Sequence, residues 1–335
     1  MNRTRKKNKN SAPALADVAR IAGVGSGTVS RVINGGKNVS PKTLARVRAV
    51  MEELGYQPSF AARTLKGAPT NTIGLIVPTV ADPFFSSAAA AIQEVASQHG
   101  VLVLLASSEN DARKEEQEVS ALIQRRVDGL IIAPSADSAP ALVKKVTFPV
   151  VCFDRPIRHA GLTTVMADNY GGARVATEHL VDRGYKRILC VGGYGGLMTS
   201  QKRFEAHKDV VQQAGLPYLA ETQAEDFIST QSAILRHVRG SERIDAIFST
   251  KNTTTVYIYK ILKELGIRIP GQIGLIGFDD FDLAEVLEPS ISVVRQPITR
   301  MATRAAEILF EEMNDPKSAH QNITLDVELV LRGSC

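Results

Sequence analysis

The body of the chain, from Thr72 onward, alternates short apolar runs with amphipathic stretches long enough to form helices. A strand buried on both faces reads as a continuous apolar run, and parallel strands are joined by crossovers that are usually helices. The apolar runs cover residues 73–78, 101–107, 129–134, 150–154, 187–193, 246–250 and 273–279. Seven or more such units predict an α/β body of two parallel-sheet subdomains rather than a single sheet.

The segment ahead of this body has a helical pattern only. Apolar residues recur at helical spacing from Leu15 until Gly23, and a second short helix is predicted over residues 26–34. Ser40 is followed by a proline, which is a strong signal for the start of a third helix. Two short helices around a glycine turn, completed by a third helix, are typical of a helix-turn-helix DNA-binding domain. We therefore expect an all-α helix-turn-helix head over residues 14–57.

The second predicted helix carries residue types that suit a contact in the major groove of DNA. Its N-terminal face has small polar residues, which allow a close approach, and Arg31 is long enough for a bidentate contact to guanine. The alternative is that Arg31 contacts only a phosphate. The predicted DNA-binding residues of the head are Leu15, Ser26, Gly27, Thr28, Ser30, Arg31, Asn34, Asn38 and Ser40.

Residues 58–70 form a short, basic, alanine-rich segment that begins with a proline. Such a segment would be a marginal helix alone, so we expect a hinge helix that forms only on DNA. Ala62 and Leu65 are predicted to bind the minor groove, with Leu65 as an apolar wedge. A plain linker is the alternative. Residues 1–13 are polar and basic, which predicts a disordered tail.

Charge is divided unevenly along the chain. Residues 1–70 hold thirteen lysines and arginines but three acidic residues, which gives this part a charge of +10 and leaves −5 for the rest. A basic head on a mildly acidic body indicates nucleic-acid binding at one end, because neutralisation of phosphates drives such binding.

Other classes of protein are not indicated. Neither the three cysteines nor the six histidines have metal-ligand spacing, so we expect no metal ion and no cofactor. The sequence has no secretory signal and no apolar run of membrane-spanning length, which predicts a cytoplasmic protein without membrane contact. The glycine-rich run 192–196 lacks the lysine of a phosphate-binding loop, and hydrolase motifs are absent, which argues against an enzyme.

Short motifs occur along nearly the whole chain. The head contains LADVARIAGV, TVSRVIN, VSPKT, ELGYQPS and AARTL, and the body contains NTIGLIVPTVADPFF, RRVDGLIIAPS, DRP and IGLIGFDD. Together they resemble the LacI/GalR family of bacterial transcription regulators. The resemblance implies a periplasmic-binding-protein-like core over residues 71–335, in which the chain crosses three times between subdomains. We place the N-subdomain at about 71–168 and 297–322, and the C-subdomain at about 169–295 and 323–335.

In parallel sheets, ligands bind beyond the carboxyl ends of the strands. The resemblance implies that Arg203 grips an effector there, that Asp279 binds effector hydroxyls, and that apolar rings line the pocket. For two residues a purely structural role is the alternative: Arg155 could tie the subdomains together, and Asp280 could cap a turn. The predicted effector-binding residues are Phe84, Phe85, Ser135, Asp154, Arg155, Arg203, Phe227, Lys251 and Asp279.

Two parts of the chain depart from the family pattern. The pair that begins at Lys251 replaces the Asn-Asp of many members, and with Arg155 and Arg203 nearby it favours a net positive pocket. That would suit an anionic effector, such as a sugar acid or a phosphorylated sugar. The alternative is that Lys251 pairs with Asp279 or Asp226 and that a neutral sugar binds. In the head, Gly25 and Gly27 stand where the family usually has side chains that read bases, so we expect sequence choice to rest more on Ser26, Arg31 and the hinge.

The resemblance implies a repressor whose homodimer binds a near-palindromic double-stranded DNA operator and whose affinity is set by a small carbohydrate-type effector. Effector binding could release DNA or strengthen its binding, because both are the same coupling with opposite sign. An activator or a solute-binding protein on the same scaffold is the alternative. A transport-linked binding protein would need a signal peptide and no DNA-binding head.

Overall fold

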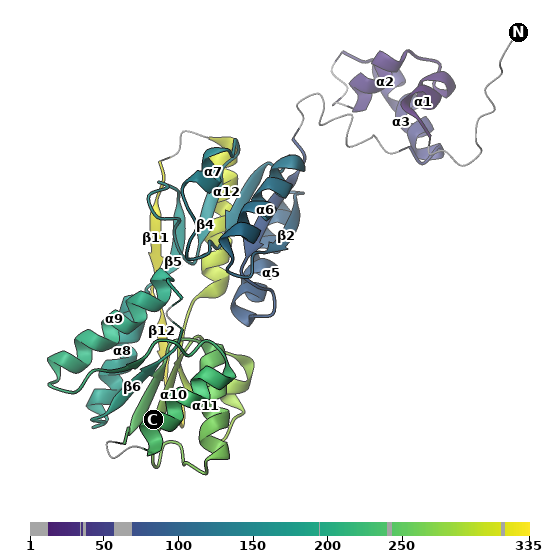
Figure 1. Ribbon diagram of the computed structural model, residues 1–335. Coiled ribbons are helices and arrows are strands. Elements are labelled where there is room, and N and C mark those ends of the chain that lie inside the picture. The colour runs from purple at the N-terminus through teal and green to yellow at the C-terminus, as the bar shows by residue number, and fades with distance from the viewer. Residues whose placement is uncertain are drawn as a thin grey trace, which may run out of the picture. The chain divides into compact units, whose positions relative to one another are not determined.

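The computed structural model describes residues 13–33, 35, 38–56, 69–193, 195–239, 243–315 and 319–335. The chain divides into two compact units, Met1–Thr70 and Asn71–Cys335 (Figure 1). The predicted tail up to residue 12, Asn34, and most of the predicted hinge, with Ala62 and Leu65, lie outside the described residues.

The first unit holds the three helices that the sequence predicts. They are α1 (Leu15–Ile21), α2 (Ser26–Ile33) and α3 (Pro41–Glu53). Ser40 caps α3, because its side chain accepts a hydrogen bond of 3.3 Å from the backbone N–H of Thr43. The apolar faces of the three helices form one small core of Val18, Ala19, Ala22, Val29, Val32, Val47 and Val50.

The second unit contains two six-stranded sheets, which define its two subdomains (Figure 1). All strand pairings are parallel except that of β10 with β12. The N-subdomain sheet has the order β11 (Asn322–Leu325), β5 (Thr164–Ala167), β4 (Val150–Phe153), β3 (Gly129–Ile132), β1 (Thr72–Val77) and β2 (Leu102–Ser107). The C-subdomain sheet has the order β12 (Glu328–Val330), β10 (Ser292–Arg295), β9 (Gly274–Phe278), β8 (Ala246–Ser249), β6 (Ile188–Val191) and β7 (Leu219–Glu221).

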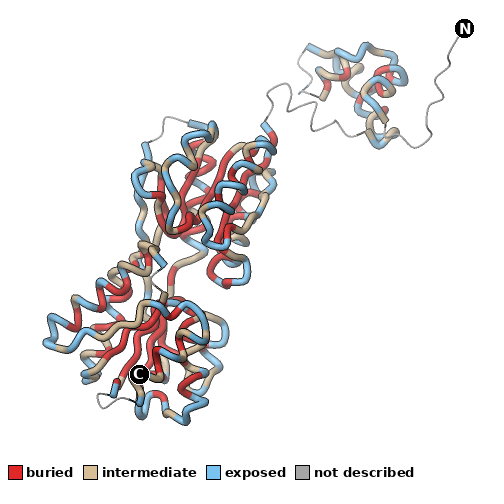
Figure 2. The backbone as a smooth tube through the Cα atoms, in the orientation of Figure 1, coloured by how far each residue is buried: buried red, intermediate tan, exposed pale blue. Residues whose placement is uncertain are grey.

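Helices cover the faces of both sheets, so the central strands are buried (Figure 2). Phe153, Phe248 and Phe278, each at the end of a strand or next to it, have no exposed surface. The N-subdomain helices are α5 (Pro83–Gln98), α6 (Ala112–Gln124), α7 (Ala141–Lys144) and α12 (Ile298–Asn314). The C-subdomain helices are α8 (Asn169–Asp182), α9 (Met198–Gln213), α10 (Phe227–Arg239), α11 (Asn252–Glu264) and the 3-10 turn η1 (Asp282–Glu285).

The chain crosses between the subdomains after β5, after β10 and after β11. The third crossing was predicted between residues 322 and 323, but the chain crosses only after Leu325. β11 stays in the N-subdomain and pairs with β5 along its whole length, while Ile323 and Leu325 pack on the N-subdomain core. The apolar run 101–107 was read as a buried strand, but its strand β2 lies at the sheet edge with Leu102 and Leu105 exposed.

Among the described residues, no helix is both long and apolar enough to span a membrane.

His207 lies on α9 and is fully buried in the C-subdomain. Its Nδ1 is 3.4 Å from Thr177 Oγ1, and its ring centroid is 6.3 Å from that of Phe248. Burial lowers the pKa of His207 to about 4, because the charged imidazolium loses its hydration. Between about pH 6.5 and pH 4 the unfolded chain therefore binds a proton that the folded chain does not.

We expect the free energy of unfolding of the core to fall by about 3 kcal/mol through His207 as the pH decreases across this window. Urea unfolding at a series of pH values measures the slope of the free energy of unfolding against pH. His207→Gln should flatten it, whereas His320→Gln, at a half-exposed histidine, should not. Equal slopes for the wild type and His207→Gln would contradict the assignment.

Candidate functional site

A small cavity of about 70 Å³ lies at the carboxyl ends of the strands of both sheets. The loops that follow β1, β2 and β4 enter it from the N-subdomain, and those that follow β6, β8 and β9 enter it from the C-subdomain. Its lining residues are Pro78, Asp82, Phe84, Phe85, Asn110, Asp154, Arg155, Leu197, Thr199, Ser200, Arg203, Thr250, Lys251, Asp279 and Gln296.

Seven of the nine predicted effector-binding residues line this cavity, namely Phe84, Phe85, Asp154, Arg155, Arg203, Lys251 and Asp279. Ser135 does not, because its backbone N–H and hydroxyl both donate to the buried carboxylate of Glu115. Phe227 also does not. It begins α10, where its ring meets that of Tyr257 and the Lys260 ammonium lies over it.

Several lining residues were missing from the predicted set. Thr250 follows strand β8, so the strand-end rule could have found it, and the same rule brings Asp82, which follows β1, to the cleft. Thr199 and Ser200 lie one turn ahead of Arg203 on α9, which is a weaker signal. Asn110, Leu197, Pro78 and Gln296 have no local pattern that distinguishes them from other loop residues.

Arg203 and Asp279 form the centre of the C-subdomain wall. Arg203 Nη1 is 3.7 Å from Asp279 Oδ2 and donates to the carbonyl of Thr250 at 2.7 Å, while its Nε donates to Asn169 Oδ1 at 2.9 Å. The guanidinium also lies 3.6 Å from the centroid of the Phe278 ring. Burial raises the pKa of Asp279, and the charge of Arg203 opposes that shift. The pair is therefore held in place before any ligand enters.

Arg155 is engaged entirely within the N-subdomain. Its Nε donates to the carbonyl of Pro134 at 2.6 Å, its Nη1 donates to Asp154 at 2.9 Å, and its Nη2 donates to Asn110 at 2.9 Å. Arg155 therefore does not tie the two subdomains together, which was the structural alternative for this residue. It presents a fixed guanidinium face at the cavity.

The expectation of a net positive pocket is wrong, because the lining holds three cationic and three acidic side chains. Lys251 does pair with a carboxylate, but its partner is neither Asp279 nor Asp226. Its Nζ lies 3.5 Å from Oδ2 of Asp82, which comes from the other subdomain. The cavity as a whole is therefore balanced in charge.

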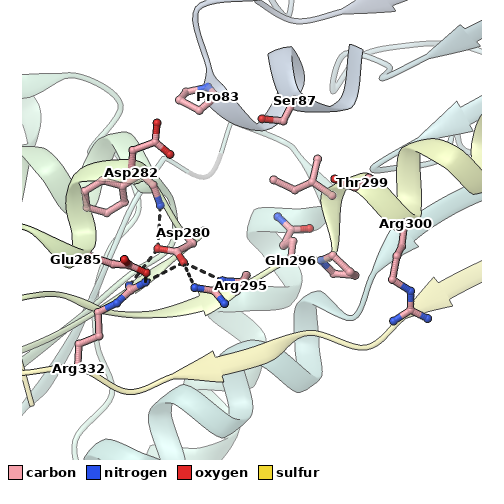
Figure 3. Close-up of a pocket in the computed structure, with 13 residues that line it drawn as sticks. Pro83, Ser87, Asp280, Asp282, Glu285, Arg295, Gln296, Thr299, Arg300 and Arg332 are labelled. Atoms are coloured by element: carbon pink, nitrogen blue, oxygen red, sulfur yellow. Dashed lines mark hydrogen bonds and ion pairs between the residues drawn. The ribbon is translucent and has the colours of Figure 1, made fainter. Parts of the chain in front are cut away.

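A second and larger hollow, of about 570 Å³, lies between η1, the start of α12 and the start of α5 (Figure 3). Asp280 stands in its wall and binds both Arg295 and Arg332 (Figure 3). Its carboxylate also accepts the backbone N–H of Phe281 at 3.0 Å. Burial would raise the pKa of Asp280, but the hydrogen bonds from the two arginines lower it below its ordinary value. Asp280 is thus a structural residue, in agreement with the turn-capping alternative.

In the head, α2 presents the predicted reading face. Ser26, Gly27 and Arg31 are exposed, and Arg31 Nε donates to the carbonyl of Gly27 at 3.3 Å. A Cβ added at Gly25 or Gly27 would meet no atom within 4 Å, so packing inside the head does not require glycine there.

The other predicted head residues differ in their surroundings. Thr28 and Ser30 are half-buried on α2, and Asn38 is exposed in the loop before α3. Leu15 is also half-buried, because it packs against the head core. The Ser40 hydroxyl is occupied at the cap of α3.

A helical DNA-binding head and a two-subdomain core with a polar cavity define a class of regulator, and comparison with known proteins gives the family. The model for bacterial regulatory proteins of the lacI family matches residues 14–59, and a periplasmic binding protein-like domain matches residues 177–335. The HTH-type transcriptional repressor PurR of Photobacterium profundum is 31% identical over 96% of this chain and 98% of its own length. The chain belongs to the LacI family of bacterial regulatory proteins.

Further relatives and solved structures are also similar to this chain over nearly its whole length. The transcriptional regulator DegA of Bacillus subtilis is 32% identical over 96% of this chain and 97% of its own length, and the ribose operon repressor of Escherichia coli K12 is 29% identical over 96% and 99%. The Lac repressor dimer bound to operator and an anti-inducer matches with a TM-score of 0.86 over 97% of this chain and 99% of that chain, at 24% identity, which supports the fold. A CelR–cellobiose complex matches with a TM-score of 0.73 over 96% and 100%, at 28% identity. The chain is a DNA-binding transcriptional regulator with a ligand-binding core, and not an enzyme.

Proposed function

We propose that the chain is a cytoplasmic repressor, that its homodimer binds a near-palindromic operator, and that a small carbohydrate-type effector in the 70 Å³ cavity sets its operator affinity. The observation that carries the effector assignment is the convergence of Asp154, Arg203 and Asp279 on one cavity between two subdomains. Polyols offer hydroxyls that carboxylates accept, and bidentate arginines donate to sugar oxygens.

Two rings support a carbohydrate in particular. Phe84 and Phe85 line the cavity in an edge-to-face pair, with 4.9 Å between ring centroids, and an aromatic ring can pack on the apolar face of a sugar. Among the relatives are ribose operon repressors, and one similar structure holds cellobiose. With the lining balanced in charge, both a neutral sugar and a sugar acid remain within this class.

The DNA-binding part of the proposal assigns the head to residues 14–57, a hinge to 58–70 and the core to 71–335. Ser26, Gly27 and Arg31 would face the major groove from α2, while Ala62 and Leu65 of the hinge would enter the minor groove. The exposed α2 face and the open space beside Gly27 support a close approach of DNA.

Selection from a pool of random DNA duplexes tests this proposal. We expect the full chain to enrich one near-palindromic site, because two-fold symmetric heads read matching half-sites. Its affinity should fall steeply with salt, because lysines and arginines of the head displace counterions from phosphates. Enrichment of no sequence, with no retention of DNA even at low salt, would refute the proposal. An activator would bind the same site, and a reporter gene fused to that site separates the two.

A further inference from the structure

We propose that Glu115 is a positioning residue of the effector site: it orients the Pro134–Ser135 peptide, and this peptide holds the Arg155 guanidinium at the cavity. The inference rests on the proposed function, because the direction of Arg155 matters to an effector only if this cavity binds one. Glu115 itself does not line the cavity, so it acts through Arg155 and not by contact with a ligand.

The carboxylate of Glu115 is buried and accepts hydrogen bonds from one loop. Glu115 lies on α6 and is 1% exposed. Its Oε2 accepts the backbone N–H of Ser135 at 2.6 Å. Its Oε1 accepts the hydroxyl of Ser135 at 3.4 Å and also the hydroxyl of Ser138. All three donors belong to the loop after β3, so one carboxylate fixes this loop to α6.

The Pro134–Ser135 peptide is held on both sides. Its N–H donates to Glu115 at 2.6 Å, and its carbonyl accepts Nε of Arg155, also at 2.6 Å. The N–H and the carbonyl of a planar trans peptide point in opposite directions, so a rotation of the peptide plane moves both. Glu115 therefore determines where the carbonyl that holds Arg155 points.

The charges on the two sides match the dipole of this peptide. The Glu115 carboxylate faces the N–H, which is the positive side, and the Arg155 guanidinium faces the carbonyl, which is the negative side. Both groups polarise the peptide in the same sense, and hydrogen bonds to ionised groups are shorter and stronger than neutral ones. Loss of the bond to Glu115 should therefore weaken the bond to Arg155.

The direction of the guanidinium decides what Arg155 offers to a ligand. A guanidinium has five N–H donors in one plane. Within the described part of the chain, three of them bind the carbonyl of Pro134, Asp154 and Asn110. Two N–H groups remain for an acceptor oxygen in the cavity that Arg155 lines. Because the group is planar, fixing Nε also fixes the direction of these two donors.

The other two acceptors of Arg155 constrain it less. Asp154 is the preceding residue, so a movement of the loop after β4 carries both side chains together. Asn110 is exposed in the loop after β2, where water competes for its amide. The carbonyl of Pro134 is the acceptor that is both buried and anchored by a separate element, and Glu115 supplies that anchor.

The test measures how often the bond between Arg155 and Pro134 opens, in the full chain without effector and without DNA. The chain is labelled with ¹⁵N at the arginine Nε, and the exchange of each Nε hydrogen with water is followed by NMR. A hydrogen in a buried hydrogen bond exchanges when that bond opens. Arg155→Lys identifies the signal of Arg155, because the variant lacks it.

Three variants separate the reach of Glu115 from its charge. Glu115→Leu removes the acceptor at similar size, and Glu115→Asp keeps the charge on a side chain that is one methylene shorter. Glu115→Gln keeps an acceptor oxygen at the same reach and removes the charge. Glu116→Leu is the matched control at an exposed position of α6. Val119→Ala loosens the packing of the same helix, because Val119 is 2% exposed in the N-subdomain core.

We expect exchange at Arg155 Nε to be about tenfold faster in Glu115→Leu and Glu115→Asp, which is the effect of losing about one net hydrogen bond. Glu115→Gln should restore the wild-type rate to within about twofold, since the peptide keeps its acceptor. The two control variants should also exchange at the wild-type rate.

Wild-type exchange in both Glu115→Leu and Glu115→Asp would overturn the proposal. Equal acceleration in Glu115→Gln would also overturn it, because charge and not orientation of the peptide would then hold Arg155. Equal acceleration in Val119→Ala would show a general loosening of α6 and would overturn it too. Neither effector nor DNA is present, so each of these results leaves the proposed function standing. Conversely, failure of every sugar to bind would leave the link between Glu115 and Arg155 untouched.

Discussion

Replacing Arg203 with alanine is expected to destabilise the core by about 3–5 kcal/mol and to abolish effector binding. Arg203 is 6% exposed and holds Asn169, the carbonyl of Thr250 and Asp279 together. Without it, the buried Asp279 carboxylate loses its opposite charge, and the carbonyl of Thr250 loses a donor. The cavity would lose the one guanidinium that its C-subdomain wall supplies.

Urea unfolding of the full chain measures the loss of stability in the core transition. Arg174→Ala is the control, because Arg174 is an exposed arginine on α8 that pairs with Glu178 on the same helix, and such pairs contribute less than about 1 kcal/mol. Arg203→Lys should fall between the two, since an ammonium keeps the charge but not the planar fork. A loss below about 1 kcal/mol for Arg203→Ala would contradict the role that we assign to this pair.

Val47→Asp is expected to unfold the head and to remove DNA binding while the core stays folded. Val47 has no exposed surface and lies in the seven-residue core of the head. A buried carboxylate without a partner costs several kcal/mol, which is about all the stability that a domain of this size has. The core is a separate compact unit with its own sheets, so its unfolding transition should not move.

Circular dichroism and DNA retention report whether the head is folded and binds DNA. The urea transition reports the stability of the core. Glu52→Asp places an aspartate on an exposed position of the same helix and should leave all three measurements unchanged. Loss of the core transition in Val47→Asp would show that the two units do not fold independently.

The predictable part of the site followed from one rule about sheets. Parallel strands present their carboxyl ends at one edge, so Asp154, Lys251 and Asp279 could be placed together from the order of apolar runs alone. Arg203 could be placed with them because it lies early on the helix after the apolar run 187–193, but its role as an effector ligand came from the family resemblance. The head was predictable because caps and helical periodicity act locally, as at Ser40.

The predictions of effector-binding residues were wrong where a hydrogen-bond partner distant in sequence decides where a side chain lies. Ser135 follows β3 as predicted, but Glu115, on another element, takes its hydrogen bonds. α10 begins at Phe227, where Asp226 accepts the backbone N–H of Ser229 at 2.7 Å in the first turn. Phe227 is therefore drawn into the helix and packs, half-buried, against the C-subdomain core beside Tyr257.

The partner of Lys251 is a further case. Asp82 lies on the opposite subdomain, 3.5 Å from the ammonium, and no local pattern connects the two positions. Charge counted along the sequence suggested a positive pocket, whereas charge counted in space is balanced.

The most direct test of the central claim is the affinity of the full chain for its selected operator, measured with and without an effector at one fixed salt concentration. A thermal-shift screen against sugars and sugar acids supplies the effector, and fluorescence anisotropy of labelled operator supplies the dissociation constant. We predict that the effector changes this constant by about 5- to 150-fold, and that operator changes the effector affinity by the same factor. A ligand that saturates the core cleft and leaves operator affinity unchanged would contradict the account.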